Sequence, residues 1–213
     1  MGATGLVGRL LADRLLAAPG PEIHALVRRP TGRSNPRWRE YVAPAGEWPG
    51  LAIEVAAQAA VSALGTTMRA AGSQSAFAAV DLDAVVAFAE AARRAGAGHM
   101  VTVSSVGADR GSSNFYLRIK GEMEQALEGL GFERLDIFQP GLLRGERGSE
   151  RRLGERIGIA LSPLVNLALR GRLDRFAAID ADRVASAIAA CLERAETGTF
   201  RHENRAIREL TAS

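Results

Sequence analysis

Short apolar runs alternate with longer amphipathic runs along most of the chain, and this alternation constrains the fold more than any other feature. A five-residue apolar run such as Ile23–Val27 suits a buried strand of a parallel sheet, because helices cover both faces of such a sheet. The runs in between place apolar residues three and four positions apart, as amphipathic helices do. We therefore expect an α/β fold with a mostly parallel, doubly wound sheet.

The predicted elements follow from this patterning and from the glycine and proline residues that end them. The first helix is expected to stop before the Pro-Gly-Pro at 19–21, and Asp81 or Asp83 is expected to cap a helix that runs to about residue 95. Residues 28–50 are rich in Pro, Gly and Arg, so we expect mainly loop with a short strand near Tyr41. The first helix covers residues 6–17, and two further predicted helices cover residues 114–130 and 182–195. Predicted strands cover residues 23–27, 57–64, 99–106 and 134–138.

Length and patterning predict a single domain over residues 1–213. The pattern loosens between residues 144 and 176, which we interpret as a lid or substrate-side segment. Its arginines alternate with glutamates, which favours a solvated, self-paired face, with a site for an anionic substrate or a partner as the alternative. These arginines are Arg144, Arg147, Arg151, Arg152 and Arg156.

Charge, cysteine content and hydropathy exclude several classes of protein. The formal net charge of +3 is smaller than a nucleic-acid-binding surface normally needs, so we expect no nucleic-acid partner. Cys191 is the only cysteine and lies in an apolar helical pattern, which indicates a buried thiol. The longest uncharged stretch, residues 55–68, is too short for a membrane span, and no signal sequence opens the chain. We therefore expect a soluble, cytoplasmic protein.

The histidines are few and scattered. His24, His99 and His202 show no metal-ligand spacing, so we expect no metal site.

A glycine-rich loop leads directly into the first predicted helix. Such glycines allow a tight turn and a close approach to a pyrophosphate, while the helix N-terminus offers free N–H groups to the anion. A strand normally precedes this loop, and only Met1 does so here. We expect the first strand to be missing, through a truncation or a wrongly assigned start. The predicted cofactor-binding residues in this loop are Gly2, Thr4, Gly5, Leu6, Val7 and Gly8.

Two arginines, Arg28 and Arg29, follow the predicted strand at 23–27. An acidic residue at this place binds a free ribose 2′-OH, whereas arginine suits a 2′-phosphate. The pair therefore favours NADP over NAD. In a chain so rich in arginine, a solvated face is the alternative reading.

Lys120 is the only lysine among 27 basic residues, and it follows Tyr116 by four positions. The two side chains therefore share one helix face. A neighbouring ammonium stabilises a phenolate, so that Tyr116 can exchange a proton with a carbinol oxygen. Ser104 and Ser105 end the strongest predicted strand, where a hydroxyl can polarise a substrate carbonyl.

Together these motifs make the chain resemble the atypical branch of the short-chain dehydrogenases/reductases, which includes Tat-interacting-protein-like oxidoreductases. The resemblance extends over nearly the whole chain, through GATGLVG, ALGTT, AGS, FAAVDLD, VSSVGAD, FYLRIKGEMEQ and PGLLRGER. It implies an NAD(P)-binding Rossmann-like fold. The chain departs from the pattern in two respects: its first strand is absent, and Gln139 stands where many relatives have Arg before Pro-Gly.

The resemblance also implies roles for individual residues. Tyr116 is the expected acid/base, Lys120 the residue that binds the nicotinamide ribose and tunes Tyr116, and Ser105 the residue that orients the substrate. Further residues expected along the cofactor are Leu64, Gly65, Thr66 and Pro140.

The sequence thus predicts an NADP(H)-dependent oxidoreductase that acts on a small carbonyl or alcohol substrate. The alternative is an NADPH-binding regulator or scaffold with a protein partner and little turnover.

Overall fold

The computed structural model describes residues 1–145 and 171–212. Most of the predicted lid at 144–176 lies outside the described residues, and so do Arg147, Arg151, Arg152 and Arg156. The longer helices are α1 (Leu6–Ala17), α2 (Trp48–Val55), α5 (Ala84–Arg94), α6 (Phe115–Glu128), α9 (Ala181–Leu192) and α10 (Asn204–Glu209). The strands are β1 (Ile23–Val27), β2 (Trp38–Val42), β3 (Ala59–Ser62), β4 (His99–Val103), β5 (Arg134–Gln139), β6 (Leu143–Arg144), β7 (Ile179–Asp180) and β8 (Gly198–Glu203).

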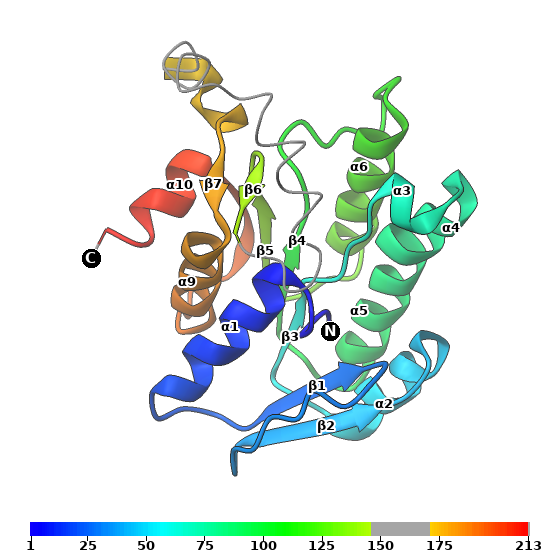
Figure 1. Ribbon diagram of the computed structural model, residues 1–213, viewed down its shortest axis with the longest axis vertical. Coiled ribbons are helices and arrows are strands. Elements are labelled where there is room, and N and C mark those ends of the chain that lie inside the picture. Colours follow the sequence, from blue (N-terminus) through cyan, green and yellow to red (C-terminus); the bar gives the residue numbers. More distant parts are fainter. Residues whose placement is uncertain (146–170, 213) are drawn as a thin grey trace.

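The strands pair in parallel, which confirms the predicted α/β fold with a mostly parallel sheet. Four strands form one sheet in the order β3-β4-β5-β8, and β1 and β2 form a separate pair. Helices cover both faces of the larger sheet, with α1 and α9 on one side and α5 and α6 on the other (Figure 1). Successive residues of β4 alternate between the two layers, since Met100 packs with α5 and α6 whereas Val101 packs with α1 and α9.

The edge of β3 that lies away from β4 faces Met1 and β1. The Met1 amine donates to the Val61 carbonyl (2.5 Å), and the Met1 carbonyl accepts from the Ala63 N–H (3.1 Å). Figure 1 shows the N-terminus beside β3, with β1 and β2 set apart from the other strands. In the described residues no strand joins β1 to β3.

Helix α2, strand β8 and helix α10 are among the elements that the sequence did not predict. Helix α2 begins inside the stretch expected to be loop, because a proline in the first turn of a helix costs no hydrogen bond. Strand β8 and helix α10 follow the helix that was expected to be the last. In β8 most side chains are exposed or half-buried, so the strand lacks the apolar run that marks a central strand.

The prediction that Asp81 or Asp83 caps a helix is wrong. Helices α4 (Gln74–Ala78), η2 (Ala79–Asp83) and α5 follow one another directly, so Asp83 already has helical dihedral angles and its side chain makes no capping bond. Asp81 is buried within η2, a π-helical turn. A π-helical turn inside a longer helix often marks a functional site, which directs attention to the Asp81 carboxylate.

Candidate cofactor and active site

The glycine-rich loop fits a dinucleotide diphosphate. Gly5 forms the N-cap of α1 without a side-chain capping bond, so no cap occupies the first N–H groups of the helix. The first turn carries no acidic residue that would repel a phosphate bound there. A Cβ on Gly8 would lie 2.1 Å from the Gly2 carbonyl oxygen, and one on Gly2 would lie 2.4 Å from the Ala63 carbonyl carbon. Gly2 also has a φ of +81°. Only glycine therefore allows this loop to close against the end of β3.

The other predicted cofactor residues lie at the carboxyl ends of strands. Arg28 and Arg29 follow β1 and are exposed, residues 64–66 follow β3, and Pro140 follows β5. The carboxyl ends of parallel strands meet at one edge of a sheet, where ligands of open α/β folds bind. The structure thus places these residues at the edge where the glycine-rich loop lies.

Helix α6 is held close to the loop that follows β4. The Asn114 side chain caps α6 by accepting from the Leu117 N–H (3.2 Å), and the Leu117 carbonyl accepts from the Asp109 N–H (3.1 Å). A Cβ on Gly121 would lie 2.2 Å from the Arg110 nitrogen, so only glycine permits this approach. These contacts fix the first turns of α6, and with them Tyr116, relative to the residues after β4.

Tyr116 and Lys120 lie one turn apart on α6, as the spacing predicted, but in different surroundings. Tyr116 is half-buried, and its ring centroid lies 5.7 Å from that of Phe77. Lys120 is buried, with its Nζ 2.7 Å from Asp81 Oδ1. The other oxygen of Asp81 accepts from the Thr66 N–H (2.8 Å). Asp81 therefore connects the predicted cofactor loop after β3 to Lys120.

The two serines after β4 differ in their partners. The Ser104 hydroxyl is buried and donates to Glu124 Oε1, whose carboxylate also accepts from Gln139 Nε2 (2.9 Å). Burial raises the pKa of Glu124, although these hydrogen bonds oppose the shift. Ser105 is half-buried, and within the described part of the chain its hydroxyl makes only a long contact of 3.4 Å with the Val106 carbonyl. Ser105 is thus the serine whose hydroxyl is freer to bind another group.

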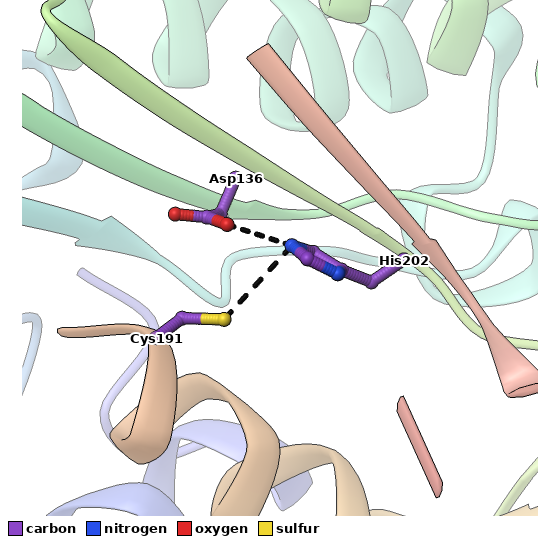
Figure 2. Close-up of side chains that lie close together, drawn as sticks. All are labelled: Asp136, Cys191 and His202. Atoms are coloured by element: carbon purple, nitrogen blue, oxygen red, sulfur yellow. Dashed lines mark hydrogen bonds and ion pairs between the residues drawn. The ribbon is translucent and has the colours of Figure 1, made fainter. Parts of the chain in front are cut away.

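Two of the three scattered histidines, His99 and His202, meet at a buried carboxylate. Asp136 Oδ2 lies 2.7 Å from His99 Nε2, and Asp136 Oδ1 lies 2.6 Å from His202 Nε2. Arg134 donates to the same carboxylate through Nε (2.6 Å) and Nη2 (3.0 Å). Cys191 Sγ lies 3.9 Å from His202, and Figure 2 shows both Asp136 and Cys191 pointing toward that ring.

Asp136, Cys191 and His202 are residue types that bind metal ions. In this cluster, however, the carboxylate is already paired and the thiol is protonated. Although burial alone would raise the pKa of Asp136, hydrogen bonds from His202, His99 and Arg134 lower it well below its usual range. Burial raises the pKa of Cys191 to about 12, so the thiol stays protonated. A guanidinium already pairs with the carboxylate, and we interpret the cluster as a buried ionic contact that joins β4, β5, β8 and α9.

The fold and the glycine-rich loop together define a nicotinamide-dinucleotide-binding protein of the Rossmann type. A family model described as NAD(P)H-binding matches residues 2–195. The chain belongs to this family.

The chain is similar in sequence to two curated proteins. The chain is 35% identical over 173 residues to a Coccidioides immitis protein named "Protein FMP52, mitochondrial", covering 75% of this chain and 70% of the relative. It is 48% identical over 92 residues to "Protein HTATIP2" of Rattus norvegicus, covering 43% and 37%.

The solved structures share the fold at low identity. The Bordetella bronchiseptica enzyme WbmH in complex with NAD+ has a TM-score of 0.67 at 16% identity, over 98% of this chain and 76% of that one. A human epimerase family protein, SDR39U1, with NADPH has a TM-score of 0.63 at 18% identity, over 95% and 72%. The family model supports a nicotinamide cofactor. One of these two neighbours holds NAD+ and the other NADPH, so they do not distinguish the two cofactors.

The comparisons correct the expected location. Several fungal relatives carry names that describe them as mitochondrial, which contradicts the expectation of a cytoplasmic protein. Composition was a poor guide, because it reports on folding class and not on compartment. Among the described residues, no helix is both long and apolar enough to cross a membrane.

Proposed function

We propose that the chain is an NADP(H)-dependent oxidoreductase that acts on a small carbonyl or alcohol substrate. The observation that carries this proposal is the pair formed by Tyr116 and the only lysine, Lys120, on the first turns of a helix held beside the loop after β4. Bound nicotinamide would supply or accept a hydride at its C4 atom. The residues of the chain would bind the partners, orient them and handle the proton on the substrate oxygen.

Each residue has a separate part in this proposal. Tyr116 donates its phenolic proton to the substrate oxygen during reduction and recovers it during oxidation. Ser105 donates a hydrogen bond to the same oxygen and orients the carbonyl. Lys120, oriented by Asp81, binds the ribose hydroxyls and presents a positive charge near the phenol.

Cofactor selection in this proposal rests on Arg28 and Arg29. Both side chains are exposed and directly follow β1. In folds of this type, the end of the corresponding strand lies beside the adenosine ribose. Guanidinium groups pair well with a phosphate, which favours NADP over NAD. We also propose that residues 1–213 act as one domain, with residues 144–176 as a lid or substrate-side segment.

The experiment is a comparison of Tyr116→Phe with Tyr41→Phe, since the chain has two tyrosines and Tyr41 lies on β2. Calorimetry measures NADPH affinity, and a panel of small aldehydes and ketones measures turnover. We expect Tyr116→Phe to keep NADPH affinity within about twofold and to lower turnover at least ~100-fold, the usual contribution of general acid catalysis. Tyr41→Phe should keep both. NADPH binding by the unsubstituted chain with no turnover of any substrate would favour a regulator, and no NADPH binding would refute the proposal.

A further inference from the structure

An exposed aromatic side chain lies near the loop that carries the predicted catalytic serine. Phe176 is the last residue of the short helix η3 (Gly171–Phe176), and it is 40% exposed. A single exposed apolar side chain is common on protein surfaces. Its supports and its neighbours therefore decide whether this ring can serve a ligand.

The backbone on both sides of Phe176 is fixed to the residues that follow β5. Asn204 is buried, and its Nδ2 donates to the Ala177 carbonyl (2.8 Å) and the Asp174 carbonyl (3.1 Å). Its Oδ1 accepts from the Gly141 N–H (3.0 Å). A Cβ on Gly141 would lie 2.3 Å from the Ala177 carbonyl oxygen, so a larger residue could not make this contact without a backbone shift. The ring thus stands on backbone that is held against the carboxyl end of the sheet.

The ring lies beside the turn that begins at Ser105, which a hydrogen bond of 3.1 Å to the Ser105 carbonyl closes. Two apolar side chains border Gly107 in this turn. A Cβ on Gly107 would lie 3.9 Å from Phe176 Cε1 and 3.7 Å from Leu117 Cδ1. Leu117 is half-buried and directly follows Tyr116 on α6. Phe176 and Leu117 therefore form an apolar patch next to both residues that are proposed to bind the substrate oxygen.

A paired guanidinium orients the ring. Arg175 Cζ lies 4.8 Å from the centroid of the Phe176 ring, a contact that attracts the cation to the aromatic face. Arg175 Nη1 lies 3.6 Å from Glu203 Oε1, so its charge already has a partner. The patch therefore offers a ligand apolar surface and no unpaired positive charge, which favours an apolar group over an anionic one.

We propose that the apolar patch of Phe176 and Leu117 selects the substrate, which is a carbonyl or alcohol compound with an aryl or branched alkyl group on the reacting carbon. This inference rests on the proposed function, in which Tyr116 and Ser105 bind the substrate oxygen. With the oxygen held there, the substituent on the same carbon lies against the patch. Apolar surface buried in this way contributes to binding, whereas a small hydroxylated carbonyl compound gains little from it.

The first experiment measures the reduction of benzaldehyde and of glycolaldehyde, a small hydroxylated aldehyde, with saturating NADPH. We expect Phe176→Ala to lower kcat/KM for benzaldehyde at least ~10-fold, mainly through KM, and to leave glycolaldehyde within about twofold. Phe176→Leu keeps an apolar side chain and should retain most of the benzaldehyde activity. Ile53→Ala is the matched control, because it removes an exposed apolar side chain from α2, and it should change neither substrate.

A second experiment measures binding without turnover. Benzyl alcohol is titrated into the chain in the presence of NADPH, where no hydride acceptor is available, and its dissociation constant is measured by nuclear magnetic resonance. We expect Phe176→Ala to weaken this binding at least ~10-fold and Ile53→Ala to leave it unchanged.

The two experiments separate this inference from the proposed function. Equal losses for both aldehydes in Phe176→Ala, or turnover of glycolaldehyde without turnover of benzaldehyde, would overturn the inference and leave an oxidoreductase. Benzyl alcohol binding that is absent or is the same in Phe176→Ala would also overturn it. Binding that depends on Phe176 in a chain that turns over neither aldehyde would support the patch as a ligand site and count against the enzymatic function.

Discussion

The Lys120 ammonium lies 2.7 Å from Asp81 Oδ1, and the two side chains are only 5% and 1% exposed. Removing one partner of a buried ion pair leaves the other charge uncompensated, which costs about 3–5 kcal/mol, whereas removing both charges costs much less. We expect Asp81→Asn to lower the free energy of unfolding by that amount. Asp81→Asn combined with Lys120→Met should recover at least half of the loss, as urea denaturation would show.

The matched control is Glu209→Gln, which breaks the exposed pair of Arg205 and Glu209. Exposed pairs of this kind contribute about 0–1 kcal/mol, so this substitution should barely change stability. Equal losses in Asp81→Asn and Glu209→Gln would contradict the importance of the buried pair.

The identity of the only lysine gives a second prediction. Lys120→Arg keeps the positive charge, so the pair with Asp81 should survive and stability should fall by less than in Lys120→Met. A planar guanidinium replaces a compact ammonium poorly where a ribose and a phenol must both be reached, so turnover should fall at least ~10-fold. Steady-state kinetics beside thermal unfolding would separate the two effects, and near-normal turnover in Lys120→Arg would refute this role.

The glycine-rich loop gives a third prediction. Gly8→Ala places a Cβ 2.1 Å from the Gly2 carbonyl oxygen, so the loop must move, at a cost of about 1–3 kcal/mol for an overpacked site. NADPH affinity measured by calorimetry should fall at least ~10-fold, because the N–H groups of α1 are displaced. Gly50→Ala is the control, since nothing lies within 4 Å of its Cβ in α2 and alanine should stabilise that helix by about 0.5–1 kcal/mol.

Much of the site could be predicted because its motifs are local. The glycine-rich loop with the helix at Leu6–Ala17, the strand at Ile23–Val27, and Tyr116 with Lys120 on one helix all depend on residues close together in the sequence. The role of Asp81 could not be predicted in this way. Its contact with Lys120 spans 39 positions and depends on how η2 packs against α6.

The cluster around Asp136 shows the same limit. His99 and His202 meet this carboxylate only because β4 and β8 both pair with β5 in the observed register. Three histidines at distant positions give no local spacing from which such a meeting could be read. A sequence pattern that predicts elements does not predict which strands lie side by side, and contacts of this kind follow from the strand order.

Cofactor choice gives a fourth prediction. If Arg28 binds a 2′-phosphate, Arg28→Ala should weaken NADPH binding by about 10-fold or more, the contribution of one charge-assisted hydrogen bond. NADH affinity should stay within about twofold. Arg205→Ala, at an exposed position on α10, is the control for the loss of a surface charge and should change neither affinity. Equal losses for NADPH and NADH in Arg28→Ala would count against NADP selection by this residue.

The pH dependence of stability gives the last prediction. Hydrogen bonds hold the pKa of Asp136 below that of the unfolded chain, which is about 3.9 for an aspartate. In acid the unfolded state therefore binds more protons, so this contribution to stability is complete above about pH 5 and is lost as the pH falls below about 4. Asn resembles a protonated Asp, so Asp136→Asn should lower the free energy of unfolding most near pH 7 and progressively less toward pH 3.

Urea denaturation of both proteins from pH 3 to pH 7 measures this difference. The raised pKa of Glu124 acts in the opposite direction, because a protonated Glu124 stabilises the fold in acid and this contribution is lost as the pH rises through its folded pKa. It is present in both proteins and cancels in the difference. Asp182→Asn, at an exposed ion pair with Arg14, should give a small difference at every pH. A gap between the unsubstituted chain and Asp136→Asn that stays constant from pH 7 to pH 3 would show that the carboxylate charge contributes nothing to the cluster.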